Sequence, residues 1–131
     1  MWDVPTSKKL VALTFDDGPH PGFTPEILDV LKKYNAKATF FVVGNRAERY
    51  PGVLKREVSE GHEIGNHTYS HTRLNHLSNP KAWQNEIEKT DTLIQNFQGA
   101  HLKLLRPPEG ILSEAIINVA VKKHYEIILW S

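Results

Sequence analysis

The chain contains no cysteine, and this excludes disulfide bonds, thiolate catalysis and cysteine-bound zinc. It also has no apolar run long enough to span a bilayer. Neither sign of charge dominates, because the chain has 16 Lys and Arg residues and 15 Asp and Glu residues, which gives a net charge of +1. These charges are scattered along the chain, so we expect neither nucleic acid nor an anionic membrane as the main partner.

Two further motifs are missing. There is no glycine-rich phosphate-binding loop and no Gly-x-Ser-x-Gly element of a serine hydrolase.

The N-terminal stretch MWDVPTSKKL has no apolar segment behind its charges, which predicts that a signal peptide is absent or has been removed. The 131 residues, of which 40% are hydrophobic, suffice for one core, so we expect residues 1–131 to form a single domain.

Short apolar runs alternate with amphipathic segments along the whole chain. The runs predicted to be strands are residues 10–15, 37–43, 62–66, 102–105 and 125–130. Four helices are predicted between them, the first capped by Thr24 with Tyr34 on its apolar face, the second from Pro51 to Gly61, the third after Asn79 with Trp83 in the core, and the fourth over residues 112–120. This alternation indicates an α/β fold with a mainly parallel sheet.

The last predicted strand, which includes Trp130, has no helix after it to cover its apolar surface. A closed βα barrel takes about 200–250 residues. We therefore expect this chain to be a piece of a longer domain.

Polar residues that can carry chemistry follow three of the predicted strands. Asp16 and Asp17 end the first strand, His67 and His71 follow the third, and the sequence RPPEG follows the fourth. In parallel α/β folds the active groups gather at the carboxyl ends of the strands. Two histidines four residues apart share one face if the segment is helical, and with one carboxylate they form a set that suits Zn²⁺, with other divalent metals as alternatives.

The two adjacent aspartates would point to opposite faces of a regular strand. We expect the alternation to lapse at Gly18-Pro19, so that one carboxylate binds the metal while the other acts as general base. Each pattern alone also has a structural interpretation, as a turn, a pair of unligated histidines or a rigid proline loop. Their coincidence at successive strand ends favours a metal-dependent hydrolase. The histidines expected on the surface or in loops are His20, His76, His101 and His124.

The motifs TFDDGP, HTYSH and RPPEG, in this order, resemble the first three motifs of the polysaccharide deacetylases of the NodB-homology type, carbohydrate esterase family 4. The resemblance implies a distorted (β/α) barrel whose C-terminal strands and helices are missing here. It also implies a hydrolase that removes N-acetyl groups from N-acetylglucosamine-containing polysaccharide, such as peptidoglycan or chitin. That substrate class implies a cell-envelope or extracellular location, and it leaves the oligomeric state open.

By the same resemblance, a metal-bound water attacks the acetamide with Asp16 as catalytic base. The remaining roles would be distributed as follows: Asp17, His67 and His71 as ligands of Zn²⁺, with Co²⁺ or Ni²⁺ as alternatives; Arg106 as the group that orients Asp16; the Glu109 backbone N–H as the oxyanion donor; and Pro107, Pro108 and His20 as substrate contacts.

The chain departs from the family pattern in two places. Glu109 stands where an aromatic residue is usual, and we expect its side chain to point toward solvent or the substrate groove. The family's general-acid histidine, in a Leu-x-His element, has no counterpart, because no histidine follows Trp130. Two alternatives therefore stay open: a catalytically impaired glycan-binding module, and an O-deacetylase acting on acetylxylan.

Overall fold

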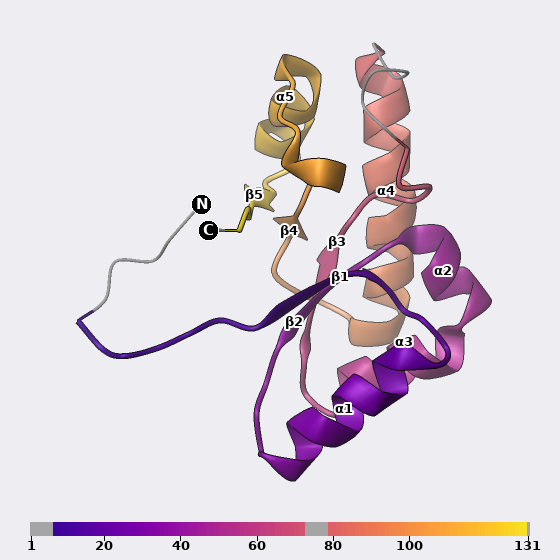
Figure 1. Cartoon of the computed structure of the whole chain (residues 1–131). Helices are drawn as coiled ribbons and strands as arrows, with labels where there is room; N and C mark the ends of the chain where they lie inside the picture. Colours follow the sequence, from indigo (N-terminus) through magenta and orange to yellow (C-terminus); the bar gives the residue numbers. More distant parts are fainter. Residues whose placement is uncertain (1–6, 73–78, 131) are drawn as a thin grey trace.

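The computed structural model describes residues 7–72 and 79–130, and it contains one five-stranded parallel sheet (Figure 1). The strands lie in the order in which they occur in the chain: β1 (Thr14–Gly18), β2 (Thr39–Val42), β3 (Glu63–Asn66), β4 (Leu104–Leu105) and β5 (Glu126–Ile127). Each neighbouring pair is parallel. A sheet with strands in chain order is the arrangement of a βα barrel wall, whereas a doubly wound sheet reverses its order. The predicted α/β class is confirmed.

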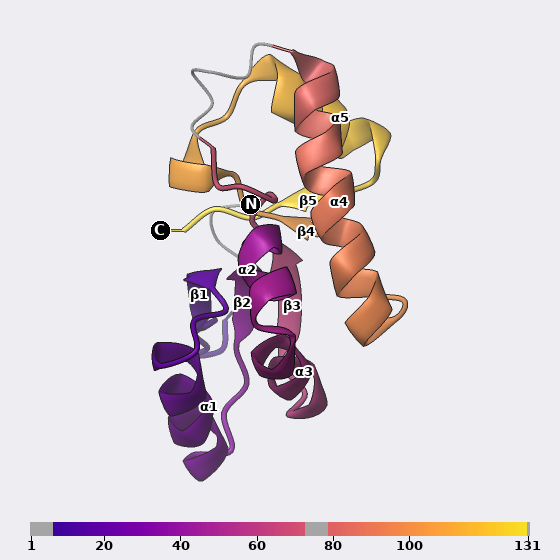
Figure 2. The same cartoon turned by 90° about the vertical axis from the view of Figure 1, so that its right-hand side faces the viewer.

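Helices connect the strands and cover the sheet. They are α1 (Phe23–Lys33), α2 (Gly44–Arg49), α3 (Pro51–Ser59), α4 (Pro80–Gln98), the short 3₁₀-helix η2 (Pro108–Gly110) and α5 (Glu114–Lys122). Figure 2 shows α2, α3 and α4 in front of the strands. No helix in residues 7–72 or 79–130 combines the length and the apolar character that crossing a membrane requires.

Helix α4 begins as its sequence predicts. The Asn79 side chain accepts a hydrogen bond from the backbone N–H of Lys81, which satisfies one of the free donors of the first turn. Trp83 is buried on the sheet side, also as predicted. Helix α2 was not predicted, because its six residues carry one buried apolar side chain, Ala47, and so show no apolar period.

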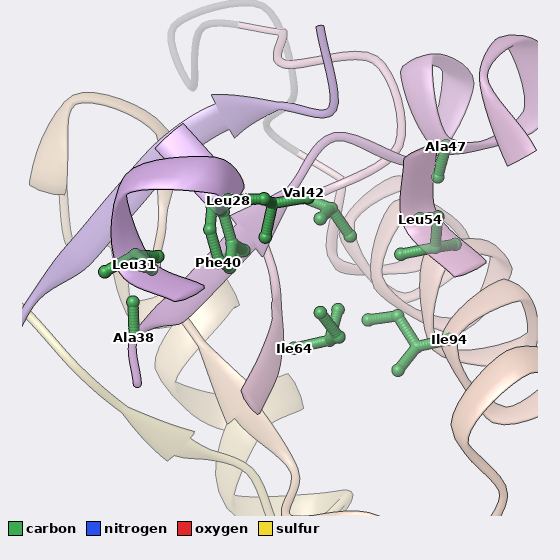
Figure 3. Packing of buried hydrophobic residues seen from close by; sticks show 9 residues of the cluster. All are labelled: Leu28, Leu31, Ala38, Phe40, Val42, Ala47, Leu54, Ile64 and Ile94. Atoms are coloured by element: carbon green, nitrogen blue, oxygen red, sulfur yellow. The ribbon is translucent and has the colours of Figure 1, made fainter. Parts of the chain in front are cut away.

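The core consists of two clusters of buried side chains. The first joins α1 and α3 to the sheet (Figure 3) and contains Leu28, Leu31, Ala38, Phe40, Val42, Ala47, Leu54, Ile64 and Ile94. The second joins α4 and α5 to β4 and contains Trp83, Ile87, Leu105, Ile116, Val119, Ala120 and Tyr125.

Strand β2 is covered on both faces, as its continuous apolar run suggests. Phe40 joins the first cluster, while Phe41, only 1% exposed, lies beside Gly65 of β3. A Cβ atom at Gly65 would lie 2.5 Å from the Phe41 ring, so a larger residue at this position would displace that ring.

The prediction of a buried strand over residues 10–15 is wrong in its first half. Leu10 and Val11 are 72% and 83% exposed, and pairing with β2 begins only at Thr14. Within the described residues β1 is an edge strand. Apolar composition alone does not distinguish a run that is buried in a sheet from one that leads into its edge.

Three smaller predictions also need correction. Helix α1 is capped by Gly22 rather than Thr24, and Thr24 is buried with its Oγ1 accepting a hydrogen bond from the His20 backbone N–H at 2.9 Å. Tyr34 lies past the last turn and is 70% exposed. Trp130 lies beyond β5, which is only two residues long.

The histidines expected on the surface or in loops can be checked in three cases. His20 and His124 are exposed, as predicted. His101 lies in the loop before β4, also as predicted, although its side chain is only 5% exposed and its Nε2 lies 3.1 Å from Asp91 Oδ1. The prediction for His76 lies outside the described residues.

Candidate active site

A bulge in β1 explains how two adjacent aspartates serve one site. The register between β1 and β2 shifts between Asp16 and Gly18, and Asp17 has a φ of +66°. Aspartate tolerates this left-handed conformation better than most residues. A bulge inserts one residue and redirects its side chain, so both carboxylates turn toward the carboxyl end of the sheet. The alternation therefore lapses as expected, but inside β1 rather than after it.

Asp17 and two histidines form a compact set of possible metal ligands. Asp17 Oδ1 lies 3.0 Å from His71 Nε2 and 3.4 Å from His67 Nε2. One ligand atom from each residue lies within 4.8 Å of the other two. With metal–ligand bonds of about 2.0–2.1 Å, the ligand atoms of a tetrahedral zinc site are about 3.3 Å apart. The three residues therefore fit Zn²⁺, and a mixed nitrogen and oxygen set also accepts Co²⁺ or Ni²⁺.

His67 is held in the form that a metal ligand needs. Its side chain is buried at the end of β3, and its Nδ1 lies 2.6 Å from the backbone oxygen of Arg106. Because a carbonyl only accepts, Nδ1 carries the proton and the Nε2 lone pair faces Asp17. Burial lowers the pKa of His67 below its ordinary value, so the neutral ring is favoured.

His71 reaches the set through a loop. The segment after β3 is not helical, since Thr68 and His71 have φ angles of +66° and +54°. The condition under which the two histidines would share a helix face is therefore not met. They converge because the loop folds back on itself, and their rings lie 5.0 Å apart between centroids.

Arg106 holds Asp16 in one orientation. Its Nη1 donates hydrogen bonds to Asp16 Oδ1 at 2.8 Å and to Thr14 Oγ1 at 2.9 Å. The other guanidinium nitrogens donate to the backbone oxygens of Ile128 and Leu129 at 3.2 and 3.3 Å. Arg106 as a whole residue is only 2% exposed. Its guanidinium packs over the Phe41 ring, with the Cζ atom 4.1 Å from the ring centroid.

This arginine also links the two halves of the site. Its backbone oxygen fixes His67, while its guanidinium fixes Asp16. The Asp16 side chain remains 28% exposed, so it can exchange a proton with a group outside. Arg106 thus sets the positions of Asp16, the predicted base, and of His67, a predicted metal ligand, together.

The other predicted site residues lie around this centre. Glu109 sits in η2 with a φ of +57°, and its side chain is exposed as expected. Pro107 and Pro108 are buried. The exposed His20 accepts hydrogen bonds at Nδ1 from the backbone N–H groups of Gly22 and Phe23, at the start of α1. Their roles toward a substrate stay predictions.

Sequence reasoning missed several supporting residues. Thr14 accepts a hydrogen bond from Arg106, and Asn66 Oδ1 accepts one at 2.9 Å from the Thr68 N–H, in the loop between the two histidines. Glu86 of α4 supports the same loop from the other side. No local sequence pattern indicates these residues. Thr14 and Glu86 contact segments that are distant in the sequence, and the contact of Asn66 depends on the path of the loop.

Comparison with known proteins places this arrangement in a family. The sequence profile described as polysaccharide deacetylase matches residues 3–128. The chain belongs to the polysaccharide deacetylase family. The predicted membership of the NodB-homology type is thereby confirmed.

The relatives of this polysaccharide deacetylase chain include enzymes with named substrates. A peptidoglycan-N-acetylglucosamine deacetylase of Bacillus cereus is 46% identical over 127 residues, which cover 97% of this chain and 46% of the relative. A crystal structure of a peptidoglycan N-acetylglucosamine deacetylase matches with a TM-score of 0.93 and 45% identity, over 99% of this chain and 60% of that one. The chain thus spans about half the length of these relatives.

A third relative was solved with a metal. It is a family 4 acetyl xylan esterase from Clostridium thermocellum in complex with a cobalt ion. It matches with a TM-score of 0.77 and 44% identity, over 85% of this chain and 54% of that one. The α/β fold is therefore shared by proteins named for amide and for ester substrates.

Proposed function

We propose that the chain carries the metal ligands and the base of a hydrolase that removes N-acetyl groups from N-acetylglucosamine units of peptidoglycan or a chitin-like polysaccharide. The observation that supports it most is the convergence of Asp17, His67 and His71 beside an aspartate held by a buried arginine. The names of two relatives support the peptidoglycan substrate. A glycan of this kind places the activity in the cell envelope or outside the cell.

Asp17, His67 and His71 would hold the ion, which we take to be Zn²⁺, with Co²⁺ or Ni²⁺ as alternatives. A bound ion of this type acidifies water and polarises a carbonyl group. The chain prepares the ligands for it, because the Arg106 carbonyl keeps the His67 proton on Nδ1 and leaves Nε2 free to bind.

Asp16 would accept the proton of the attacking water. Its Oδ1 is bound to Arg106, so we assign the proton to Oδ2, the oxygen outside that pair. The four hydrogen bonds of the Arg106 guanidinium keep the carboxylate in place during this transfer. The backbone N–H of Glu109 would donate to the acetyl oxygen as its negative charge develops. Pro107, Pro108 and His20 would contact the sugar.

The ligands and the base are distinguished by separate variants. Asp17→Ala and His71→Ala should weaken zinc binding, measured by competition with a chromophoric chelator. Asp16→Asn should retain zinc and lower acetate release from N-acetylated chitooligosaccharides or peptidoglycan by about 10²–10⁴-fold. Loss of zinc in Asp16→Asn would show that the two aspartates have the opposite roles.

The similarity to an acetyl xylan esterase supports one second candidate, an O-deacetylase of xylan. The same metal and base serve an ester as well as an amide. Acetate release from acetylxylan and from chitooligosaccharides, compared with metal supplied, separates the two substrates. Binding of either glycan without release of acetate, by a domain that extends past Ser131, would instead indicate a glycan-binding module.

A further inference from the structure

The loop between His67 and His71 contains no helix or strand, yet its backbone is firmly paired on both sides. The carbonyl oxygens of Thr68 and Tyr69 accept hydrogen bonds from the N–H groups of Gly44 and Asn45, each at 2.9 Å. These donors belong to the first turn of α2, where N–H groups have no partner within the helix. The α2 end therefore holds the carbonyl side of the loop.

The amide side of the loop is held by a single carboxylate. Glu86 Oε2, on α4, accepts hydrogen bonds from the Tyr69 N–H at 3.0 Å and from the Ser70 N–H at 2.8 Å. The Ser70 hydroxyl lies 3.0 Å from both oxygens of the same carboxylate. Hydrogen bonds to an ionised acceptor are about twice as strong as neutral ones. Glu86 thus fixes the two residues that directly precede His71.

The part of α4 that carries Glu86 is itself held in place. Asn66 at the end of β3 donates from Nδ2 to the backbone oxygen of Ile87 at 2.8 Å, which ties α4 to the strand that carries the histidines. Thr90, one turn further, donates from Oγ1 to the Glu86 backbone oxygen. The Asn66–Ile87 contact therefore fixes the position of Glu86 relative to β3, while the Thr90 contact lies within α4.

We propose that Glu86 is a positioning residue of the metal site, which holds the loop so that His71 Nε2 reaches Asp17. This proposal rests on the proposed metal-dependent function. The loop needs such a restraint, because Thr68 and His71 both adopt the left-handed backbone conformation that non-glycine residues disfavour. His67 does not need it, because its side chain is fixed by the Arg106 carbonyl and its N–H by the Val42 carbonyl. Glu86 therefore acts on the site through His71.

The first test compares zinc affinity in Glu86→Ala and Glu86→Gln. Groups that orient metal ligands typically change affinity by 10- to 100-fold, so Glu86→Ala should weaken zinc binding by about tenfold. Glu86→Gln keeps one acceptor oxygen of the same shape and should lose about threefold or less on the same scale. In the metal-free protein, hydrogen exchange of the Tyr69 and Ser70 amides should become faster in Glu86→Ala.

A matched control lies two residues further along α4. The Glu88 carboxylate pairs with Lys123 Nζ at 2.6 Å and accepts a hydrogen bond from Gln84 Nε2 at 2.9 Å. Among the described residues, it makes no hydrogen bond to the loop between His67 and His71. Glu88→Ala removes an equal charge from the same helix, and it should leave zinc affinity unchanged.

A double-mutant cycle separates positioning from general damage. In a His71→Ala background, Glu86→Ala should not weaken zinc binding further, because the residue through which it acts is gone. An equal loss in both backgrounds would overturn the proposal, as would wild-type zinc affinity in Glu86→Ala. If the wild-type chain binds no zinc, the proposed metal site fails, and amide exchange at Tyr69 and Ser70 alone decides whether Glu86 holds the loop.

Discussion

Glu57 of α3 should make the stability of the fold fall as pH rises. The residue is fully buried, and within residues 7–72 and 79–130 neither of its carboxylate oxygens has a hydrogen-bond partner. It lies beneath the turn that follows Asp17, where a Cβ atom at Gly18 would be 3.9 Å from Glu57 Oε1. Burial without a partner disfavours the charged form and raises the pKa of Glu57 from 4.5 to about 8.

The size of the effect follows from this pKa difference. A carboxyl whose pKa is higher in the folded state binds its proton more tightly there, so its stabilising effect is complete below pH 4.5 and is lost as pH rises through 8. Between pH 5 and pH 8 the free energy of unfolding should fall by about 3.5 kcal/mol through this one group. Around pH 6 to 7 the slope should approach about 1.4 kcal/mol per pH unit.

Urea denaturation of the metal-free protein at several pH values measures this slope. The variants Glu57→Gln and Glu57→Met are neutral at every pH, so each should gain stability relative to the wild type as pH rises, by about 3.5 kcal/mol between pH 5 and pH 8. Subtraction removes the contributions of all other titrating groups. If the free energy of unfolding changed with pH in parallel for the wild type and both variants, the reasoning would be refuted. Such a result would show that Glu57 ionises normally or is not buried.

Three further substitutions test the contacts that support the site. Gly65→Ala places a Cβ atom 2.5 Å from the Phe41 ring and should lower the free energy of unfolding by about 1–3 kcal/mol in urea; Gly52→Ala, whose Cβ would meet nothing within 4 Å, is the control and should show no such loss. Asn79→Ala removes the cap of α4 and should cost about 1 kcal/mol, and unchanged stability would show that the cap contributes nothing. Arg106→Lys keeps the charge but not the planar set of donors, so acetate release should fall by about 10- to 100-fold while zinc affinity stays unchanged; lost zinc would place the arginine side chain in the metal site as well.

The sequence predicts local features of this fold well. The N-terminus of α4 follows from Asn79-Pro80 and from Trp83 at helical spacing, because these signals act within a few residues. The order of strands and helices follows from apolar periodicity. The family follows from three short motifs, and the family profile confirms it.

The features that the sequence does not reveal depend on distant partners. Leu10 and Val11 look like a buried strand, but the residues that would cover them determine their burial, and these cannot be read from the run itself. The loop that carries His71 resembles a helical pair by spacing, whereas its actual path is set by hydrogen bonds to α2 and to Glu86. Glu57 lies three residues after Leu54, on the apolar face of its helix, but the sequence does not show that its carboxylate finds no hydrogen-bond partner among the described residues.

The pair between Arg106 and Asp16 joins residues 90 positions apart in the chain. Contacts of such long range form late in folding, because closing a long loop costs entropy that only the assembled neighbours repay. Asp16 is therefore oriented only after β4 has docked beside β3, when both core clusters are in place. A partly folded intermediate that contains only β1, β2 and β3 would lack this pair, the Arg106 carbonyl that fixes His67 and the Glu86 carboxylate that holds the loop of His71. Zinc uptake and catalytic competence should consequently appear together during refolding, in the kinetic phase in which α4 and β4 dock.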